Sequence, residues 1–245
     1  MQNYLSKIII LFLIGLFGLT QEAYTQPANG RLQVADSLFS KHQYTQSFDY
    51  YQQILHQDQF YSPQMLLKMA FIQEGLRNYT QALYFLHLYH AKYPSRAALR
   101  KIEELARAHK LSGYVYSDLD FFETQFHKHY LKLLELMLMA AVIALTVMAI
   151  NKRKNKPIPG LFKVVFGVYM LFIFYFLNFL DFGKEGIIRQ NQVPVMSAPS
   201  AGSQWISTTG AGHKVSITSE QDIWYQVKWN GQKAFIRKNN ILPLP

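Results

Sequence analysis

The sequence has no cysteine among its 245 residues. This absence excludes disulfide bonds, thiolate metal sites, cysteine nucleophiles and a lipid-modified N-terminal cysteine. It does not exclude export, because an exported domain that buries enough apolar surface does not require disulfide bonds.

The local motifs of common catalytic sites are also missing. Residues 202–214, GSQWISTTGAGHK, are rich in glycine and serine, but they lack Walker spacing, precede a predicted strand and contain no Gly-x-Ser-x-Gly elbow. His87 and His90 lie three residues apart on a predicted helix and could face one metal ion. No third ligand accompanies them, so we interpret them as surface histidines. We therefore expect no enzyme, no metal and no cofactor.

Acidic residues are scarce, with 15 Asp and Glu against 25 Lys and Arg and a net charge of +10. Residues 26–130 are nearly balanced, with 11 basic against 9 acidic residues, and residues 183–245 carry 7 against 3. No dense basic patch coincides with stacking aromatics, which argues against a nucleic-acid partner. The densest basic stretch is NKRKNKPIPG, residues 151–160, which has no acidic residue.

Three runs carry almost no charge. The first, Ile8–Leu19, has twelve residues and would span only about 18 Å as a helix, short of a hydrocarbon core of about 30 Å. The small residues Ala23 and Thr25 follow it, so residues 1–25 predict a cleaved secretory signal peptide. The alternative is an uncleaved anchor, which would leave the same side exposed.

The other two apolar runs, Leu131–Ile150 and Val164–Leu180, are long enough to cross a bilayer. Neither has a polar stripe on any face, whereas a helix of a soluble protein normally has one. We predict membrane helices over 131–150 and 161–182, joined by the loop 151–160. The alternative is a buried helical hairpin in a soluble protein.

Positive residues in short loops are retained in the cytoplasm. The loop between the two runs carries four positive residues, which we call the topology residues: Lys152, Arg153, Lys154 and Lys156. The predicted signal peptide independently exports residues 26–130. Both indications give a two-pass protein of the inner membrane with both soluble parts on the periplasmic or outer side.

Small residues on both predicted membrane helices indicate that the helices pack closely. Ala140, Ala141 and Ala144 form a patch on the first, and Gly167 offers a matching gap on the second. We expect Asn178 to form a hydrogen bond between the helices.

Residues 26–114 contain a repeat of period 35. ADSLFSKHQYTQSFDYYQQIL from Ala35 matches MAFIQEGLRNYTQALYFLHLY from Met69, displaced by one residue. Small residues recur where paired helices approach, Tyr44 and Tyr79 begin the second helix of each unit, and Pro94 ends the last one. A third helix then carries an apolar stripe at helical spacing. Its members are Ala98, Leu99, Ile102, Leu105 and Ala106.

This region resembles the tetratricopeptide-repeat family, whose period is near 34 residues. NYTQALYFLHLYHAKYP follows the family's aromatic–x–x–Ala-Leu…Pro half, whereas the first repeat departs from it with Ser47 in place of Ala. The resemblance implies a concave face of first helices that binds peptides or partner proteins. By position, the residues expected to line it are Asp36, Phe39, Leu67, Phe71 and Glu74. Alternatively, the three apolar ones are simply core.

Aromatic residues are frequent in the segment YVYSDLDFFETQFHKHY, which joins the repeats to the first membrane helix. We interpret residues 115–130 as an interfacial linker helix whose Tyr and Phe side chains lie at headgroup level.

Residues 183–245 change character, with short alternating runs separated by Gly, Asn, Ser and Pro and an Asn-Gly turn in WNGQ. This pattern predicts a small all-β barrel. GHKVSI and IWYQV resemble strands of the bacterial SH3 domain, although Ala234 and Phe235 replace the family's Gly-Trp pair. We expect Trp224 in the core, and Trp205 and Trp229 as surface candidates for binding a peptide.

The chain is thus expected to be multidomain, with all-α tetratricopeptide repeats, a two-helix transmembrane hairpin and an SH3-like barrel. This order resembles the BatE-like proteins of aerotolerance operons. The resemblance implies an envelope complex with von Willebrand A-domain membrane proteins, linked to a MoxR-type ATPase, and no reaction.

We therefore hypothesise a non-enzymatic membrane-anchored adaptor. One alternative is a receptor whose SH3-like domain binds peptidoglycan peptides. A second is a transporter component that uses Glu135 and Asp181 near the outer ends of the helices. A contact between the repeats and the SH3-like domain is equally compatible with the sequence.

Overall fold

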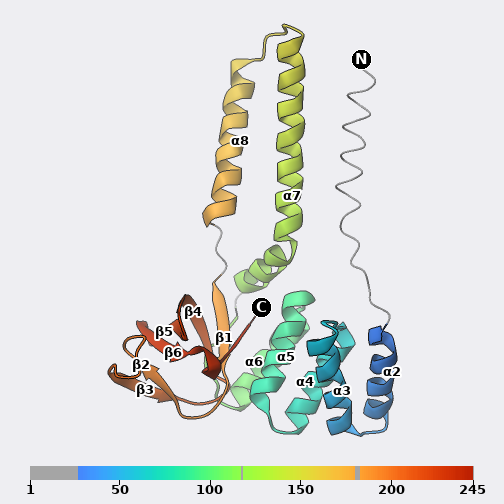
Figure 1. Cartoon of the computed structure of the whole chain (residues 1–245), viewed down its shortest axis with the longest axis vertical. Coiled ribbons are helices and arrows are strands. Elements are labelled where there is room, and N and C mark those ends of the chain that lie inside the picture. The colour runs from blue at the N-terminus through green and yellow to red at the C-terminus, as the bar shows by residue number, and fades with distance from the viewer. Residues whose placement is uncertain (1–26, 117, 180–182, 245) are drawn as a thin grey trace. The chain divides into compact units, whose positions relative to one another are not determined.

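The structure is a computed structural model that describes residues 27–116, 118–179 and 183–244 (Figure 1). The predicted signal peptide and Asp181 lie outside the described residues. The chain forms two compact units, Met1–Tyr61 and Ser62–Pro245.

The first unit is an antiparallel pair of helices, α2 (Pro27–Ser40) and α3 (Tyr44–Gln57). Ala35 and Ser47 are fully buried where the helices approach, and the Ser47 hydroxyl donates to the Ala35 carbonyl over 2.8 Å. A larger pair of side chains would separate the helices at this point. The expectation of small residues at the approach is confirmed here.

Three further helices open the second unit: α4 (Pro63–Gly75), α5 (Tyr79–Lys92) and α6 (Arg96–Ala108). The hydroxyl of Ser62 caps α4 by accepting from the Met65 N–H, and a proline follows at the first helical position. Helix α5 begins at the expected tyrosine and ends two residues before Pro94.

Helices α4 and α5 form an antiparallel pair that α6 extends. Ala70 and Ala82 are buried, as the repeat predicts. All five members of the predicted α6 stripe are buried as well. The helical spacing of apolar residues therefore identified the packed face of α6.

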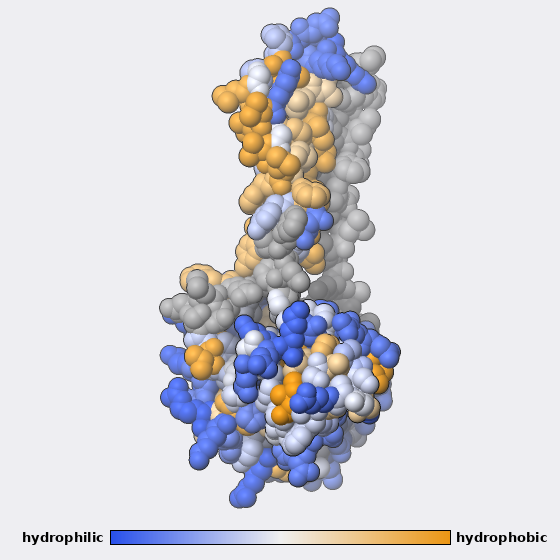
Figure 2. Space-filling view, turned by 90° about the vertical axis from the view of Figure 1, so that its left-hand side faces the viewer, coloured by the Kyte–Doolittle hydropathy of each residue, from blue (hydrophilic) through white to orange (hydrophobic). Residues whose placement is uncertain are grey.

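Two long apolar helices follow, α7 (Asp118–Arg153) and α8 (Gly160–Phe179), and Figure 1 shows them side by side. Both are long and apolar enough to cross a membrane, over Lys128–Arg153 and Gly160–Asn178. Residues 118–130 of the predicted linker helix and the first predicted span belong to one continuous helix, whereas Val115 and Tyr116 of the predicted linker lie outside it. Figure 2 shows apolar surface along this hairpin and a hydrophilic cap at its tip.

The hairpin is held by a few contacts on one side of each helix. Tyr130 stacks on Phe176 with ring centroids 4.8 Å apart, and its hydroxyl donates to the Phe176 carbonyl. The Tyr169 hydroxyl donates to the carbonyl of Met137 over 2.8 Å. Of the predicted small-residue patch, Ala141 is buried, Ala144 is half-buried and Ala140 is exposed, so the patch is only partly confirmed.

Two expectations about the hairpin are wrong. A side chain at Gly167 would meet nothing within 4 Å, so this glycine does not allow a close approach of the helices. The Asn178 amide donates to the carbonyl of Phe174, one turn earlier on the same helix, and not to α7. Aromatic stacking and tyrosine hydroxyls make the contacts that small residues were expected to make.

The C-terminal region is a seven-stranded antiparallel sheet of hydrogen-bonded order β3-β2-β6-β5-β4-β1-β7. The strands are β1 (Lys184–Ile188), β2 (Val193–Met196), β3 (Trp205–Thr209), β4 (Lys214–Gln221), β5 (Trp224–Trp229), β6 (Gln232–Arg237) and β7 (Ile241–Pro243). A short 3₁₀ turn, η2 (Lys238–Asn240), precedes β7.

The core of the sheet is a cluster of aliphatic side chains contributed by alternate strand positions, among them Ile188, Val195 and Val227. The hairpin between β5 and β6 turns at Asn230 and Gly231, both at positive φ (48° and 80°). Such angles are typical of the Asn-Gly hairpin turn that the sequence predicts.

Candidate functional site

Two of the predicted partner-binding residues lie in the first unit, and both have internal contacts. Asp36 accepts a hydrogen bond from the Tyr51 hydroxyl over 2.5 Å. This contact and burial raise the pKa of Tyr51, with burial the larger cause. The ring of Phe39 is half-buried against Tyr44, edge to face at 5.3 Å.

The other three predicted residues lie on α4 in the second unit. Leu67 and Phe71 are 40% and 55% exposed, one helical turn apart. The interpretation of these two as core is therefore wrong. Glu74, one turn further, forms an ion pair with Lys101 of α6 at 2.7 Å. The apolar pair is exposed at the surface, and the carboxylate is already paired.

The tryptophans of the sheet differ in exposure. Trp224 is buried with Met196 and Phe235, as expected of a core residue. Trp205 is 60% exposed on β3, at an edge of the sheet. Trp229 packs against the aliphatic core, and its buried indole N–H has no hydrogen-bond partner in the described part of the chain. Of the two proposed peptide-binding tryptophans, Trp205 offers the larger surface.

The four topology residues are all exposed at the tip of the hairpin. Lys152 and Arg153 form the last turn of α7, where positive charge is favourable beside the carbonyl end of a helix. Lys154 and Lys156 follow in the loop. The tip thus carries a compact group of cations between two apolar helices.

Residues 112–114 join the helices to the sheet, across about 100 positions of sequence. The backbone N–H of Lys214, at the start of β4, donates to the Ser112 carbonyl over 3.0 Å. The buried Tyr114 hydroxyl donates to the Gly212 carbonyl over 2.6 Å. The ring of His213 accepts at Nδ1 from the Ser112 N–H over 3.1 Å. We call this contact the helix–sheet junction, comprising residues 111–116 and 211–214.

Gly113 is required at the centre of the helix–sheet junction. Its φ is +92°, a conformation that side chains rarely adopt. A Cβ atom here would lie 2.5 Å from the carbonyl oxygen of Lys214. The backbones therefore approach as closely as the absence of a side chain allows.

A lysine with little exposure lies beside the helix–sheet junction. The side chain of Lys214 is 8% exposed, and its ammonium group contacts Glu185 of β1 at 2.7 Å. The same ammonium group lies 4.5 Å from the centre of the Tyr116 ring. Ion pairing and the cation–π contact together offset the cost of removing the charge from water.

His87 and His90 of α5 are buried, so their interpretation as surface histidines is wrong. His87 Nε2 lies 3.0 Å from the Tyr116 hydroxyl, and burial, then the charge of Lys214, lower the pKa of His87 well below its usual value. His90 accepts from the Ser95 N–H at Nδ1, and burial lowers its pKa. Within the described residues no group of three potential ligands surrounds a metal position.

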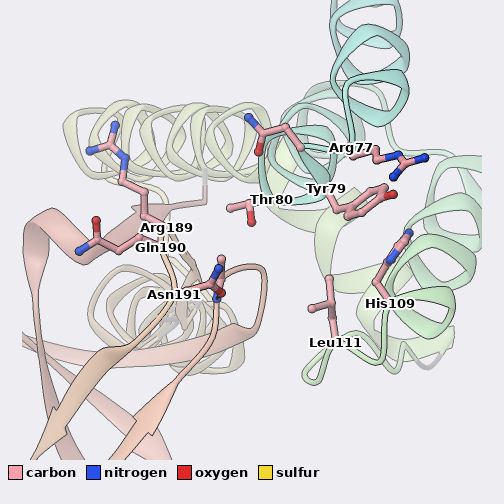
Figure 3. A pocket seen from close by; sticks show the side chains of 10 residues that line it. Arg77, Tyr79, Thr80, His109, Leu111, Arg189, Gln190 and Asn191 are labelled. Carbon is pink, nitrogen blue, oxygen red and sulfur yellow. Dashed lines mark hydrogen bonds between the residues drawn. The ribbon is translucent and has the colours of Figure 1, made fainter.

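A cleft of about 530 Å³ opens beside the helix–sheet junction (Figure 3). On its helical side lie Arg77, Thr80 and His109, and on its sheet side lie Arg189 and Gln190. None of its lining residues is acidic. The cleft can therefore accept a polar or anionic group from solution.

Sequence reasoning missed the roles of Tyr114 and Tyr116. Tyr116 was assigned to the headgroup level of the membrane and Tyr114 to the end of the repeat region, but both lie in the helix–sheet junction. The Ser-Gly-Tyr sequence before an aromatic-rich helix was the only local signal, because a glycine there marks a close approach of backbone as well as a turn. No local sequence pattern identifies residues 212–214 as the segment that contacts Tyr114 and Tyr116.

No protein-family model matches this chain, and a comparison with curated proteins finds no significant match.

Proposed function

We propose that the chain is a non-enzymatic adaptor, anchored in a membrane by α7 and α8, that binds partner proteins of an envelope complex. In this proposal it is a BatE-like protein whose helices are tetratricopeptide repeats and whose sheet is an SH3-like barrel. The observation that carries the proposal is the helix–sheet junction, which joins two modules on either side of the hairpin in sequence. Such modules, without a recognised reaction centre, suit binding better than catalysis.

The physical advantage of the helix–sheet junction is preorganisation. Two binding modules connected by flexible chain lose conformational entropy when a partner engages both. Here the backbone pairing at Ser112 and the Tyr114 hydrogen bond hold α5, α6 and β4 together before any partner arrives. A partner that contacts both modules then gains the second contact at little additional cost.

The exposed apolar residues supply the candidate contacts. Leu67 and Phe71 form a neighbouring pair on α4, and Trp205 lies on an edge strand. Apolar and aromatic anchors of this kind carry much of the energy of protein interfaces. Partners in the proposed complex are membrane proteins, including von Willebrand A-domain proteins.

The basic tip supports the proposed topology, in which the tip is cytoplasmic and both modules are periplasmic. Since the chain has no cysteine, Asn155→Cys creates a single labelling site. We expect an impermeant maleimide to spare this site in intact spheroplasts and to label it after lysis. Added protease should digest the modules without lysis. Labelling before lysis, with both modules protected, would overturn the topology.

The adaptor role is tested by affinity purification of the full-length chain from gentle detergent, followed by mass spectrometry. We expect co-purifying membrane proteins with the unaltered chain and a loss of at least tenfold with Leu67→Ser combined with Phe71→Ser. Ile223→Ser is the matched control, because Ile223 is 52% exposed in the β4–β5 turn. Equal recovery with all chains would contradict the assigned surface. Retention on purified wall material alone would favour the receptor.

A further inference from the structure

The charges around the cleft beside the helix–sheet junction are unbalanced. Arg77 and Arg189 lie on its helical and sheet sides, and His109 stacks on Tyr79 at the helical side with ring centroids 3.5 Å apart. Neither arginine forms an ion pair with another residue in the described part of the chain. Both are exposed. The cleft therefore presents positive charge that the protein does not neutralise itself.

A side chain of low exposure is directed into the same cleft. Thr80 is 8% exposed, and Figure 3 shows its side chain between Arg189 on one side and Arg77 on the other. Its hydroxyl forms no hydrogen bond with any described residue. The hydroxyl is not one of the enclosed side-chain oxygens that lack a partner, so it is open to the cleft and available to donate to a ligand.

The beginning of α5 adds further donors. Asn78 precedes the helix, and its side chain makes no capping hydrogen bond. The first helical hydrogen bond to its carbonyl comes from the Ala82 N–H, so the N–H groups of the first turn have no partner within the helix. These groups and the helix dipole favour negative charge at this end.

We infer that this cleft binds a carboxylate-bearing segment of a partner protein, an inference that rests on the proposed adaptor function. Arginine guanidinium groups pair with carboxylates in a fixed planar geometry, and the Thr80 hydroxyl and first-turn N–H groups add neutral donors. A cleft of about 530 Å³ has the size of typical ligand sites. It accommodates a short acidic peptide.

The position of the cleft along α5 favours a protein over a lipid headgroup as the source of the anion. The C-terminal end of α5 contacts α7, through His90 with Phe121 and Tyr93 with Lys128. The cleft lies at the opposite end, about 20 Å further along a helix of fourteen residues. In the proposed anchoring, a headgroup beside Lys128, where the apolar part of α7 begins, is separated from the cleft by this length of α5.

The test measures binding of fluorescein-labelled tetraglutamate to the full-length chain in neutral detergent. We expect saturable binding that weakens at least tenfold in Arg77→Glu and Arg189→Glu and about threefold in Thr80→Val. Arg100→Glu is the matched control, because it makes the same charge change at an exposed position of α6 outside the cleft, and it should alter binding less than twofold. Tetraglutamine should not bind.

Three results would overturn the inference: no saturable binding of tetraglutamate, equal weakening by Arg100→Glu, or stronger competition by phosphatidylglycerol vesicles than by unlabelled tetraglutamate. A fourth result would also overturn it: displacement of the peptide by inorganic phosphate at lower concentration than by acetate would assign the cleft to phosphate instead. If Arg77→Glu recovered the same partner proteins as the unaltered chain, the proposed role of the cleft would be wrong, whereas the adaptor function would still be supported. If the unaltered chain bound tetraglutamate but recovered no partner protein, the adaptor function would be wrong, whereas the cleft would still be an acidic-peptide site.

Discussion

The helix–sheet junction and the α7–α8 hairpin are two contacts within one unit, and they are built differently. The helix–sheet junction uses backbone pairing, the buried hydroxyl of Tyr114 and a lysine with 8% exposure. The hairpin has two tyrosine hydrogen bonds and leaves large apolar side chains exposed, such as Leu171 at 69%. One contact depends on particular partners, and the other on general composition.

Under the proposed membrane anchoring, the difference follows from the solvent that each contact faces. In water, a buried polar group must find a specific partner, so the helix–sheet junction is defined atom by atom. In a bilayer, lipid covers the apolar side chains as well as a neighbouring helix does, so the hairpin needs little packing to be stable. The three predictions below test this contrast, starting with the largest expected effect.

Gly113→Ala should separate the modules of the helix–sheet junction. The positive φ alone costs about 1–3 kcal/mol for a residue with a side chain, and the approach of the new Cβ to the Lys214 carbonyl adds to it. We expect a lower free energy of unfolding and rapid trypsin cleavage after Lys110, which is exposed. Both are measured on the full-length chain in detergent.

Gly75→Ala serves as the control for that substitution. Gly75 ends α4, and a side chain there would meet nothing within 4 Å. Its free energy of unfolding should stay within about 1 kcal/mol of the unaltered chain, or rise slightly. If Gly113→Ala behaved in the same way, the helix–sheet junction would not be the close contact described above.

Acid should weaken the helix–sheet junction through His87. Burial, the nearby Lys214 and His90 lower the pKa of His87 well below 6.5, so the unfolded chain binds a proton more readily than the folded one. Tyr114 and Tyr116 also pack against its ring. Stability is therefore present above pH 6.5 and is lost as the pH falls below it, by up to about 1.4 kcal/mol per pH unit for this group.

The corresponding measurement is urea unfolding between pH 7.5 and 5, followed by tryptophan fluorescence. In His87→Gln the decline with acid should become shallower, whatever the substitution does to stability at neutral pH. The pKa of His90 is also lowered by burial, so part of the decrease in the free energy of unfolding with falling pH should remain in His87→Gln. Identical slopes in the two chains would show that His87 is not the group that titrates.

Tyr169→Phe should have the smallest effect. It removes the hydrogen bond to the Met137 carbonyl, and polar contacts between membrane helices contribute only about 0.6 kcal/mol on average. The free energy of unfolding of the full-length chain in detergent should fall by no more than this amount. A loss as large as that of Gly113→Ala would mean that the hairpin also depends on specific partners.

The same contrast explains what the sequence could predict. The hairpin, the α6 stripe and the turn at Asn230 and Gly231 all follow from local patterns of length, periodicity or backbone conformation. The burial of His87 could not be predicted, because the residues that cover it come from the segment before α7 and from β4. The local sequence around a histidine on a helix does not indicate which distant segments will pack against it.

The cleft was missed for a related reason. Arg77 ends the turn before α5, while Arg189 follows β1, more than a hundred positions away. Each arginine alone is typical of a solvated surface. Only their arrangement on either side of Thr80 indicates the inferred anion-binding site, and this arrangement depends on the same long-range pairing as the helix–sheet junction.

The 101-residue separation between Ser112 and His213 has a consequence for biosynthesis. A ribosome that adds about 5–20 residues per second needs on the order of 5–20 s to make that stretch. During this delay the face of α5 that will contact β1 stays bare, and in the proposed anchoring the hairpin enters the bilayer in the same interval. The newly made helices therefore pass through an interval of vulnerability to aggregation and proteolysis that ends only when the last strands arrive.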